Sequence, residues 1–197
     1  MNTELVAKTI YGRASKTKER TALITGNRIP KDFFITSGCG QSDITVHAGS
    51  YHLALREAKI ERCNIICYSS ILPSIANKIE FDTENLVHGS VMETIMACAN
   101  AAKGVRATAA VIFGWLYDKK TGEKYGGLVC EYNGHDKEED AIESLRMSLQ
   151  ELYQNGYSDQ FELKDIELNS RSFIPDKKFG TALVALCFVN YAYPILN

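Results

Sequence analysis

The stretch at residues 63–73, with the sequence CNIICYSSILP, constrains the fold of this chain more than any other. Its first part, residues 64–68, is a short apolar run with isoleucine and tyrosine, which is typical of a buried strand. Pro73 has no N–H group to donate, so it cannot continue a sheet ladder. We therefore predict that a strand ends at Ser69 and Ser70 and that the backbone turns there. On composition alone, such a serine pair is a hydroxyl-capped strand end.

Five blocks of sequence together change that interpretation. Besides residues 63–73, they are TSGCGQSD at 36–43, HGSVME at 88–93, GGLVCEY at 126–132 and KFGTA at 178–182. In this order and at this spacing, the blocks resemble the pyruvoyl-dependent arginine decarboxylase family over roughly residues 30–190. The positions that match the family's self-cleavage site are Asn64, Ser69, Ser70, Ile71 and Pro73. One short block is a weak signal, whereas the ordered set is specific.

The resemblance implies a fold and an assembly. The family fold is an α/β structure of the α+β type, a four-layer αββα sandwich, and its chains form trimers with active sites between subunits. The mixture of strands, helices and hairpins expected from this sequence agrees with a layered structure. We therefore expect a polar extension at residues 1–28, one decarboxylase domain at residues 29–197, and a homotrimer of cleaved chains.

The resemblance also implies the chemistry. Decarboxylation of an amino acid needs an electron sink, and a carbonyl that forms a Schiff base with the substrate amine supplies one. In this family the Ser70 hydroxyl attacks the Ser69 carbonyl, the resulting ester eliminates, and residue 70 becomes a covalent pyruvoyl group. Residues 1–69 then form the smaller chain. No pyridoxal phosphate is needed, and the sequence has no convincing phosphate cup for that cofactor.

Matching positions imply roles for further residues. Asn64 is the candidate donor for the oxyanion formed during cleavage, and Glu131 is the acid that returns a proton to the substrate. Leu55 and Ile71 are expected to line the pocket. Taken alone, Glu131 is more simply an outward-facing residue on an alternating strand, and the GGLVCEY block around it favours the catalytic role.

One departure from the family bears on the substrate. The resemblance implies conversion of L-arginine to agmatine, a step of polyamine biosynthesis. The position eighteen residues before Ser70 is usually an aspartate that receives the cationic end of arginine, but here it is His52. A neutral imidazole cannot accept the two parallel hydrogen bonds that a guanidinium donates. Asp43 replaces that aspartate if residues 36–43 close over the site as a glycine-rich loop; otherwise ornithine or lysine is the alternative substrate.

Composition excludes several other classes of protein. The net charge of −2 is unlike that of a general nucleic-acid binder, and there is no run of about 18 apolar residues to predict a membrane span. The N-terminal residues lack the apolar centre of a signal peptide. The six cysteines have neither CxxC spacing nor a histidine at zinc-ligand spacing. We therefore expect reduced thiols in a cytoplasmic protein without a bound metal.

Periodicity predicts the order of the elements. Strands are expected at residues 33–35, 64–68, 79–81, 109–117, 125–132, 161–173 and 181–189. Helices are expected at residues 49–59 and 90–102, and from about Asp136 to Gly156.

Two alternatives to the decarboxylase stay open. A cofactor-free hydrolase would pair Ser70 with one of the four histidines, which are His47, His52, His88 and His135, but Ser70 lacks a GxSxG context. A binding homologue would keep the fold without cleaving itself. The mass of the denatured protein separates it from the decarboxylase, because only the decarboxylase gives two chains.

Overall fold

The computed structural model describes residues 25–195 of the chain. Contacts divide the chain into two compact units, residues 28–192 and the residues on either side of them. In the smaller unit, Thr25 and Ile195 form an antiparallel bridge, and the Gly26 N–H donates to the Pro194 carbonyl at 2.8 Å. The polar extension predicted at residues 1–28 lies almost entirely outside the described residues and stays a prediction.

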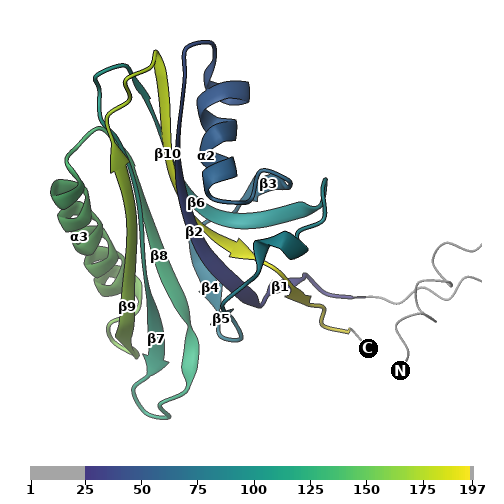
Figure 1. The fold of residues 1–197 in the computed structure, drawn as a ribbon. Helices are drawn as coiled ribbons and strands as arrows, with labels where there is room; N and C mark the ends of the chain where they lie inside the picture. The colour runs from purple at the N-terminus through teal and green to yellow at the C-terminus, as the bar shows by residue number, and fades with distance from the viewer. Residues whose placement is uncertain (1–24, 196–197) are drawn as a thin grey trace, which may run out of the picture. The chain divides into compact units, whose positions relative to one another are not determined.

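Two sheets form the larger unit (Figure 1). The five-stranded sheet has the order β3 (Asn64–Cys67), β6 (Val91–Ala102), β10 (Phe179–Phe188), β2 (Asp32–Ser42) and β5 (Asn77–Lys78). The four-stranded sheet has the order β4 (Ile71–Pro73), β8 (Lys124–Gly134), β7 (Ala107–Asp118) and β9 (Phe161–Phe173). A small antiparallel pair joins β1 (Ile29–Pro30) to β11 (Tyr191–Ala192).

The helices lie on the outer faces of these two sheets (Figure 1). A π-helix, η1 (Val46–Tyr51), leads directly into α2 (His52–Glu57), and both contact the five-stranded sheet. The long helix α3 (Glu138–Gly156) covers the four-stranded sheet. A 3₁₀ turn, η2 (Thr83–Asn85), lies in the connection between β5 and β6.

Side chains of β10 show how the four layers are held together. Val184 and Leu186 pack into the cluster between the two sheets, whereas Leu183, Ala185 and Cys187 pack into the cluster beneath α2. A third cluster joins α3 to the outer face of the four-stranded sheet. Successive residues of a strand point to opposite faces, so a strand buried on both sides is apolar throughout. The α+β fold class predicted from the family resemblance, a four-layer αββα sandwich, is confirmed.

The glycine-rich segment is not a loop. Residues 36–42 continue β2, and Gly38 and Gly40 lie where that strand passes under α2. A Cβ atom on Gly38 would lie 2.1 Å from the carbonyl oxygen of Ala54, and one on Gly40 would lie 2.1 Å from that of Ser50. The glycines therefore permit close packing of a helix on a strand, and the prediction of a closing loop at residues 36–43 is wrong.

The helix predicted at residues 90–102 is also wrong, because these residues form β6. Ala97 and Ala99 face the cluster between the sheets, while Met92 and Met96 face the cluster beneath α2. Burial on both faces removes the alternation that distinguishes a strand from a helix in the sequence. The strand predicted at residues 79–81 is instead the two-residue β5, and β3 is an exposed edge strand rather than a buried one.

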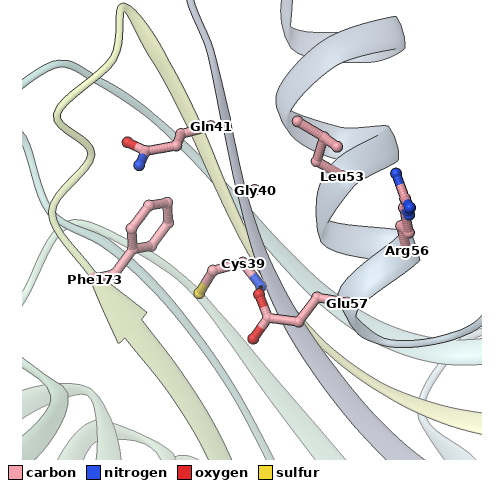
Figure 2. A pocket seen from close by; sticks show the side chains of 7 residues that line it. All are labelled: Cys39, Gly40, Gln41, Leu53, Arg56, Glu57 and Phe173. Carbon is pink, nitrogen blue, oxygen red and sulfur yellow. Dashed lines mark hydrogen bonds between the residues drawn. The ribbon is translucent and has the colours of Figure 1, made fainter.

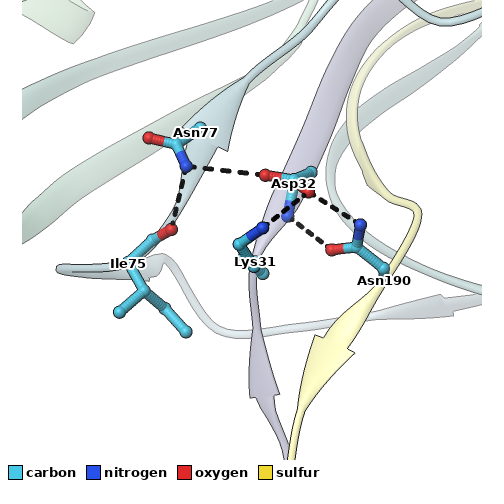
Figure 3. Close-up of polar contacts among 5 residues, drawn as sticks. All are labelled: Lys31, Asp32, Ile75, Asn77 and Asn190. Atoms are coloured by element: carbon cyan, nitrogen blue, oxygen red, sulfur yellow. Dashed lines mark hydrogen bonds and ion pairs between the residues drawn. The ribbon is translucent and has the colours of Figure 1, made fainter.

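A polar cluster ties the ends of three elements together (Figure 3). The Asp32 carboxylate accepts hydrogen bonds from Asn190 at 2.7 Å, from Lys31 at 3.2 Å and from Asn77 at 3.5 Å. The Asp32 N–H in turn donates to the Asn190 side-chain oxygen at 3.0 Å. The Asn190 hydrogen bond is the main cause of a pKa for Asp32 below its ordinary value, since it favours the charged form.

Candidate functional site

The two serines lie where the chain crosses from one sheet to the other. Before them, β3 belongs to the five-stranded sheet, and after them β4 belongs to the four-stranded sheet. The Tyr68 N–H donates to the Thr94 carbonyl at 2.7 Å, which extends the pairing of β3 with β6. On the far side, the Ser70 carbonyl accepts the Val129 N–H at 3.1 Å. The Ser69–Ser70 peptide is therefore held between two anchored ends.

The Ser70 hydroxyl faces a carboxylate. Its Oγ donates to Glu131 and lies 2.6 Å from Oε1 and 2.7 Å from Oε2. Glu131 shares the inner face of β8 with Val129, whose side chain packs in the cluster between the sheets. A carboxylate at this distance is placed to take the proton from a serine hydroxyl that acts as a nucleophile.

The Ser69 carbonyl already accepts a backbone hydrogen bond. The Ile71 N–H donates to the Ser69 oxygen at 3.0 Å, which closes a three-residue turn around Ser70. This oxygen becomes negatively charged if Ser70 attacks the Ser69 carbonyl carbon, and a fixed N–H donor stabilises such a charge. A backbone N–H has no signature in the sequence, so this donor is visible only in the structure.

Asn64 is engaged elsewhere. Its side-chain Nδ2 donates to the Gly89 carbonyl at 2.9 Å, and its backbone N–H donates to the Ser90 carbonyl at 2.8 Å. In this chain Asn64 therefore fastens the start of β3 to the turn before β6. Its predicted role as the oxyanion donor stays a prediction.

Asp43 lies at the opposite end of the five-stranded sheet from the serines. It directly follows β2, whose last residue pairs with Phe179 at the start of β10. The Tyr68 N–H is hydrogen-bonded to Thr94, which pairs with Cys187 of β10. Phe179 and Cys187 are eight residues apart on β10, so the ends of the sheet next to Asp43 and next to the serines are roughly 26 Å apart. The Asp43 carboxylate accepts the Lys178 N–H at 3.1 Å.

The other predicted pocket residues lie on two sides of the five-stranded sheet. Leu55 is buried between α2 and the outer face of that sheet, whereas Glu131 lies on the inner side. His52 is exposed at the start of α2. Ile71 follows Ser70 directly, and 63% of its surface is exposed. One chain thus brings together Ser70, Glu131 and Ile71, but not the residues of α2.

The Ser70 hydroxyl is not paired with a histidine. Among residues 25–195, it is hydrogen-bonded to Glu131 and to no histidine, so one chain does not form the serine–histidine pair of the hydrolase alternative. Burial raises the pKa of the neighbouring Cys130 to about 11, which keeps that thiol protonated. Within the described part of the chain, no three potential ligands cluster as they would around a metal ion, and no helix could span a membrane.

A cavity beside α2 is separate from the serines (Figure 2). It has a volume of about 580 Å³ and lies between α2 and the free edge of β2. The Glu57 carboxylate reaches across to accept the Cys39 N–H at 3.0 Å, and it also pairs with Arg171. The lining residues are Cys39, Gly40, Gln41, Leu53, Arg56, Glu57 and Phe173.

Comparison with known proteins gives a consistent match. The family model for pyruvoyl-dependent arginine decarboxylase matches residues 32–193. The pyruvoyl-dependent arginine decarboxylase AaxB of Chlamydia pneumoniae is 35% identical over 192 residues, which cover 84% of this chain and 94% of that protein. AaxB of Chlamydia muridarum is 33% identical over 189 residues with the same coverage. A probable pyruvoyl-dependent arginine decarboxylase of Chlorobaculum parvum is 30% identical over 132 residues, 61% of this chain and 70% of that protein.

Proposed function

This chain belongs to the pyruvoyl-dependent arginine decarboxylase family, and on that premise we propose that it cleaves itself between Ser69 and Ser70 and decarboxylates L-arginine to agmatine and CO₂. The observation that carries the proposal is the contact between the Ser70 hydroxyl and the Glu131 carboxylate. It joins the predicted nucleophile to the predicted acid across 61 residues of sequence. The proposal includes a cytoplasmic location, in keeping with six cysteines that are all unpaired.

Self-cleavage begins at the Ser70 hydroxyl. Glu131 takes its proton as Oγ attacks the Ser69 carbonyl carbon, and the Ile71 N–H donates to the oxygen that becomes negative. The peptide C–N bond then breaks as the Ser70 nitrogen takes up the proton that Glu131 holds, which leaves an ester between Ser69 and the Ser70 side chain. Loss of the Ser70 Cα proton and cleavage of the Cβ–O bond release the Ser69 carboxylate and leave dehydroalanine at residue 70. The dehydroalanine takes up a proton at Cβ to become an imine, and water hydrolyses the imine to ammonia and a pyruvoyl carbonyl.

The residues around position 70 fit a pyruvoyl group formed from Ser70. Its side chain points at Glu131, and Ile71 lies beside it with an exposed surface that a substrate can contact. A pyruvoyl group at residue 70 would supply the carbonyl that decarboxylation of an amino acid needs as an electron sink. Glu131 is then within reach of residue 70 to donate a proton to the substrate Cα.

The cationic end of the substrate needs a further partner. We propose that a homotrimer completes the site with the residues of α2 and Asp43 from a neighbouring chain. The distance of roughly 26 Å between Asp43 and the serines in one chain supports a contribution from a second copy. Arginine remains the proposed substrate, with Asp43 as the carboxylate for its guanidinium in place of His52. Ornithine or lysine is the alternative, because an ammonium group does not require a bidentate acceptor.

Mass spectrometry of the denatured protein tests the proposal. We expect wild type to give residues 1–69 and a pyruvoyl-blocked chain of residues 70–197, and Ser70→Ala to remain a single chain. Purified wild type should release CO₂ from arginine, and Ser70→Ala should not. Full-length wild type that decarboxylates arginine would contradict self-cleavage, and cleaved wild type inactive on arginine would contradict the substrate.

A further inference from the structure

A buried carboxylate that the proposed chemistry does not use lies next to the cleavage site. Only 3% of the Glu93 side chain is exposed. Glu93 shares the inner face of β6 with Ile95 and precedes Thr94, the residue whose carbonyl accepts the Tyr68 N–H. A buried carboxylate without partners would destabilise the fold strongly.

Two side chains within residues 25–195 hold Glu93. The Arg28 Nε donates to Oε2 at 3.2 Å, and Nη2 of the same guanidinium pairs with Oε1. The Tyr68 hydroxyl donates a hydrogen bond to Oε2. The guanidinium lies over the ring of Tyr191, with 5.6 Å between its central carbon and the ring centroid. Charge-assisted hydrogen bonds of this kind are stronger than neutral ones.

Tyr68 is consequently fixed at three points, two residues before the nucleophile. Its hydroxyl is bound to Glu93, its N–H is bound to Thr94, and its ring packs at 5.8 Å from that of Phe188. Between Tyr68 and the bond to be broken there is one residue, Ser69. The direction of the Ser69 carbonyl therefore depends on where Tyr68 is held.

We propose that Glu93, Tyr68 and Arg28 are positioning residues for self-cleavage, an inference that rests on the function proposed above. Arg28 orients the Glu93 carboxylate, and Glu93 holds Tyr68. Tyr68 in turn aims the Ser69 carbonyl carbon at the Ser70 hydroxyl and the Ser69 oxygen at the Ile71 N–H. Attack within the chain needs this alignment, and a displacement of about 1 Å reduces the rate of such a reaction by up to about 100-fold.

The test measures the first-order rate of self-cleavage in Tyr68→Phe and Glu93→Gln. Both substitutions preserve the size of the side chain, and Tyr68→Phe keeps the contact with Phe188. We expect each to slow cleavage by roughly 10- to 100-fold. The double variant should be no slower than the slower single one, because both act through the same hydrogen bond. Tyr117→Phe is the matched control: it removes a tyrosine–carboxylate hydrogen bond of 2.9 Å on β7 and should cleave at the wild-type rate.

Two further readouts separate positioning from folding. The same substitutions in the uncleavable Ser70→Ala chain should leave the folded fraction at the assay temperature unchanged. Hydroxylamine cuts the ester between Ser69 and the Ser70 side chain, and it should release less product from Tyr68→Phe than from wild type, because less ester forms. Cleavage of both Tyr68→Phe and Glu93→Gln at the wild-type rate would overturn the inference. A slower rate would also overturn it if the folded fraction of the same variant fell by the same factor. Failure of wild type itself to cleave would instead refute the proposed function.

Discussion

Substitution of Gly38 by alanine tests the packing of β2 beneath α2. The new Cβ atom would lie 2.1 Å from the carbonyl oxygen of Ala54 and 2.8 Å from the N atom of Ala58. Real Cβ contacts are no shorter than 3.0 Å and are rarely below 3.4 Å, so α2 must move by roughly 0.9–1.3 Å. Both blocking atoms belong to the backbone of the helix, and no change of rotamer relieves the clash.

The expected loss of stability follows from the rigidity of the helix backbone. Overpacking of a well-packed interior destabilises a protein by about 1–3 kcal/mol, and contact with backbone atoms places Gly38→Ala at the upper end. In a chain of this size, 1 kcal/mol lowers Tm by about 2–4 °C, so about 3 kcal/mol lowers it by about 6–12 °C. If residues 36–43 formed a loop, the same substitution would have almost no effect.

The assay is thermal and urea unfolding in the Ser70→Ala chain, which keeps every sample uncleaved, at one protein concentration. Gly156→Ala is the matched control, because in the described structure its Cβ would meet no atom within 4 Å, and alanine is the better helix former. We expect Gly156→Ala to be neutral or stabilising by up to about 1 kcal/mol. A free energy of unfolding for Gly38→Ala within about 0.5 kcal/mol of the parent would refute the close contact of strand and helix.

Three further predictions concern the site and the polar cluster of Asp32. Glu131→Gln should lower the rate of self-cleavage, and kcat of any processed fraction, by about 10²–10⁴-fold with little change in Tm; a near-normal rate would remove Glu131 from the chemistry. Asp43→Asn should raise KM for arginine strongly, while His52→Asp should leave it unchanged or lower it; unchanged kinetics in Asp43→Asn, with faster turnover of ornithine or lysine by wild type, would contradict the arginine assignment. Because its hydrogen bond with Asn190 lowers the pKa of Asp32, stability from that bond is present above the unfolded pKa and lost as pH falls through the folded one. The destabilisation caused by Asn190→Ala should therefore shrink below about pH 4 in urea titrations, and a constant difference would contradict the charge effect.

Local patterns in the sequence were sufficient for several elements. The sequence predicts a helix from an apolar stripe of Ile142, Leu145, Leu149 and Leu152, and Leu145 and Leu149 are buried in α3. Ala141 completes the buried face, whereas Leu152 is exposed. The turn of polar residues at 118–122 joins β7 to β8 as a hairpin. The blocks of sequence predict Ser70 and Glu131 as site residues, and the structure brings their side chains into contact.

Elements buried on both faces were beyond local patterns. The sequence of β6 predicts a helix, because it is rich in alanine and methionine and lacks the alternation of polar and apolar residues that marks a strand. Its pairing with β3 and β10 makes it a strand. Gly38 and Gly40 predict a loop from the sequence. In the structure, they lie in a strand, where a larger side chain would collide with the helix packed on it. In both cases the environment comes from residues far away in the sequence.

The amino-acid sequence by itself predicted which stretch reacts, which helix is amphipathic and which family the chain resembles, because these properties are carried by neighbouring residues. The tertiary structure alone decided which groups surround the Ser69–Ser70 bond. The Ile71 N–H reaches the Ser69 carbonyl through a turn, and Glu93 reaches Tyr68 from 25 residues away. Backbone donors have no side-chain signature, and contacts between distant residues depend on how the strands pair.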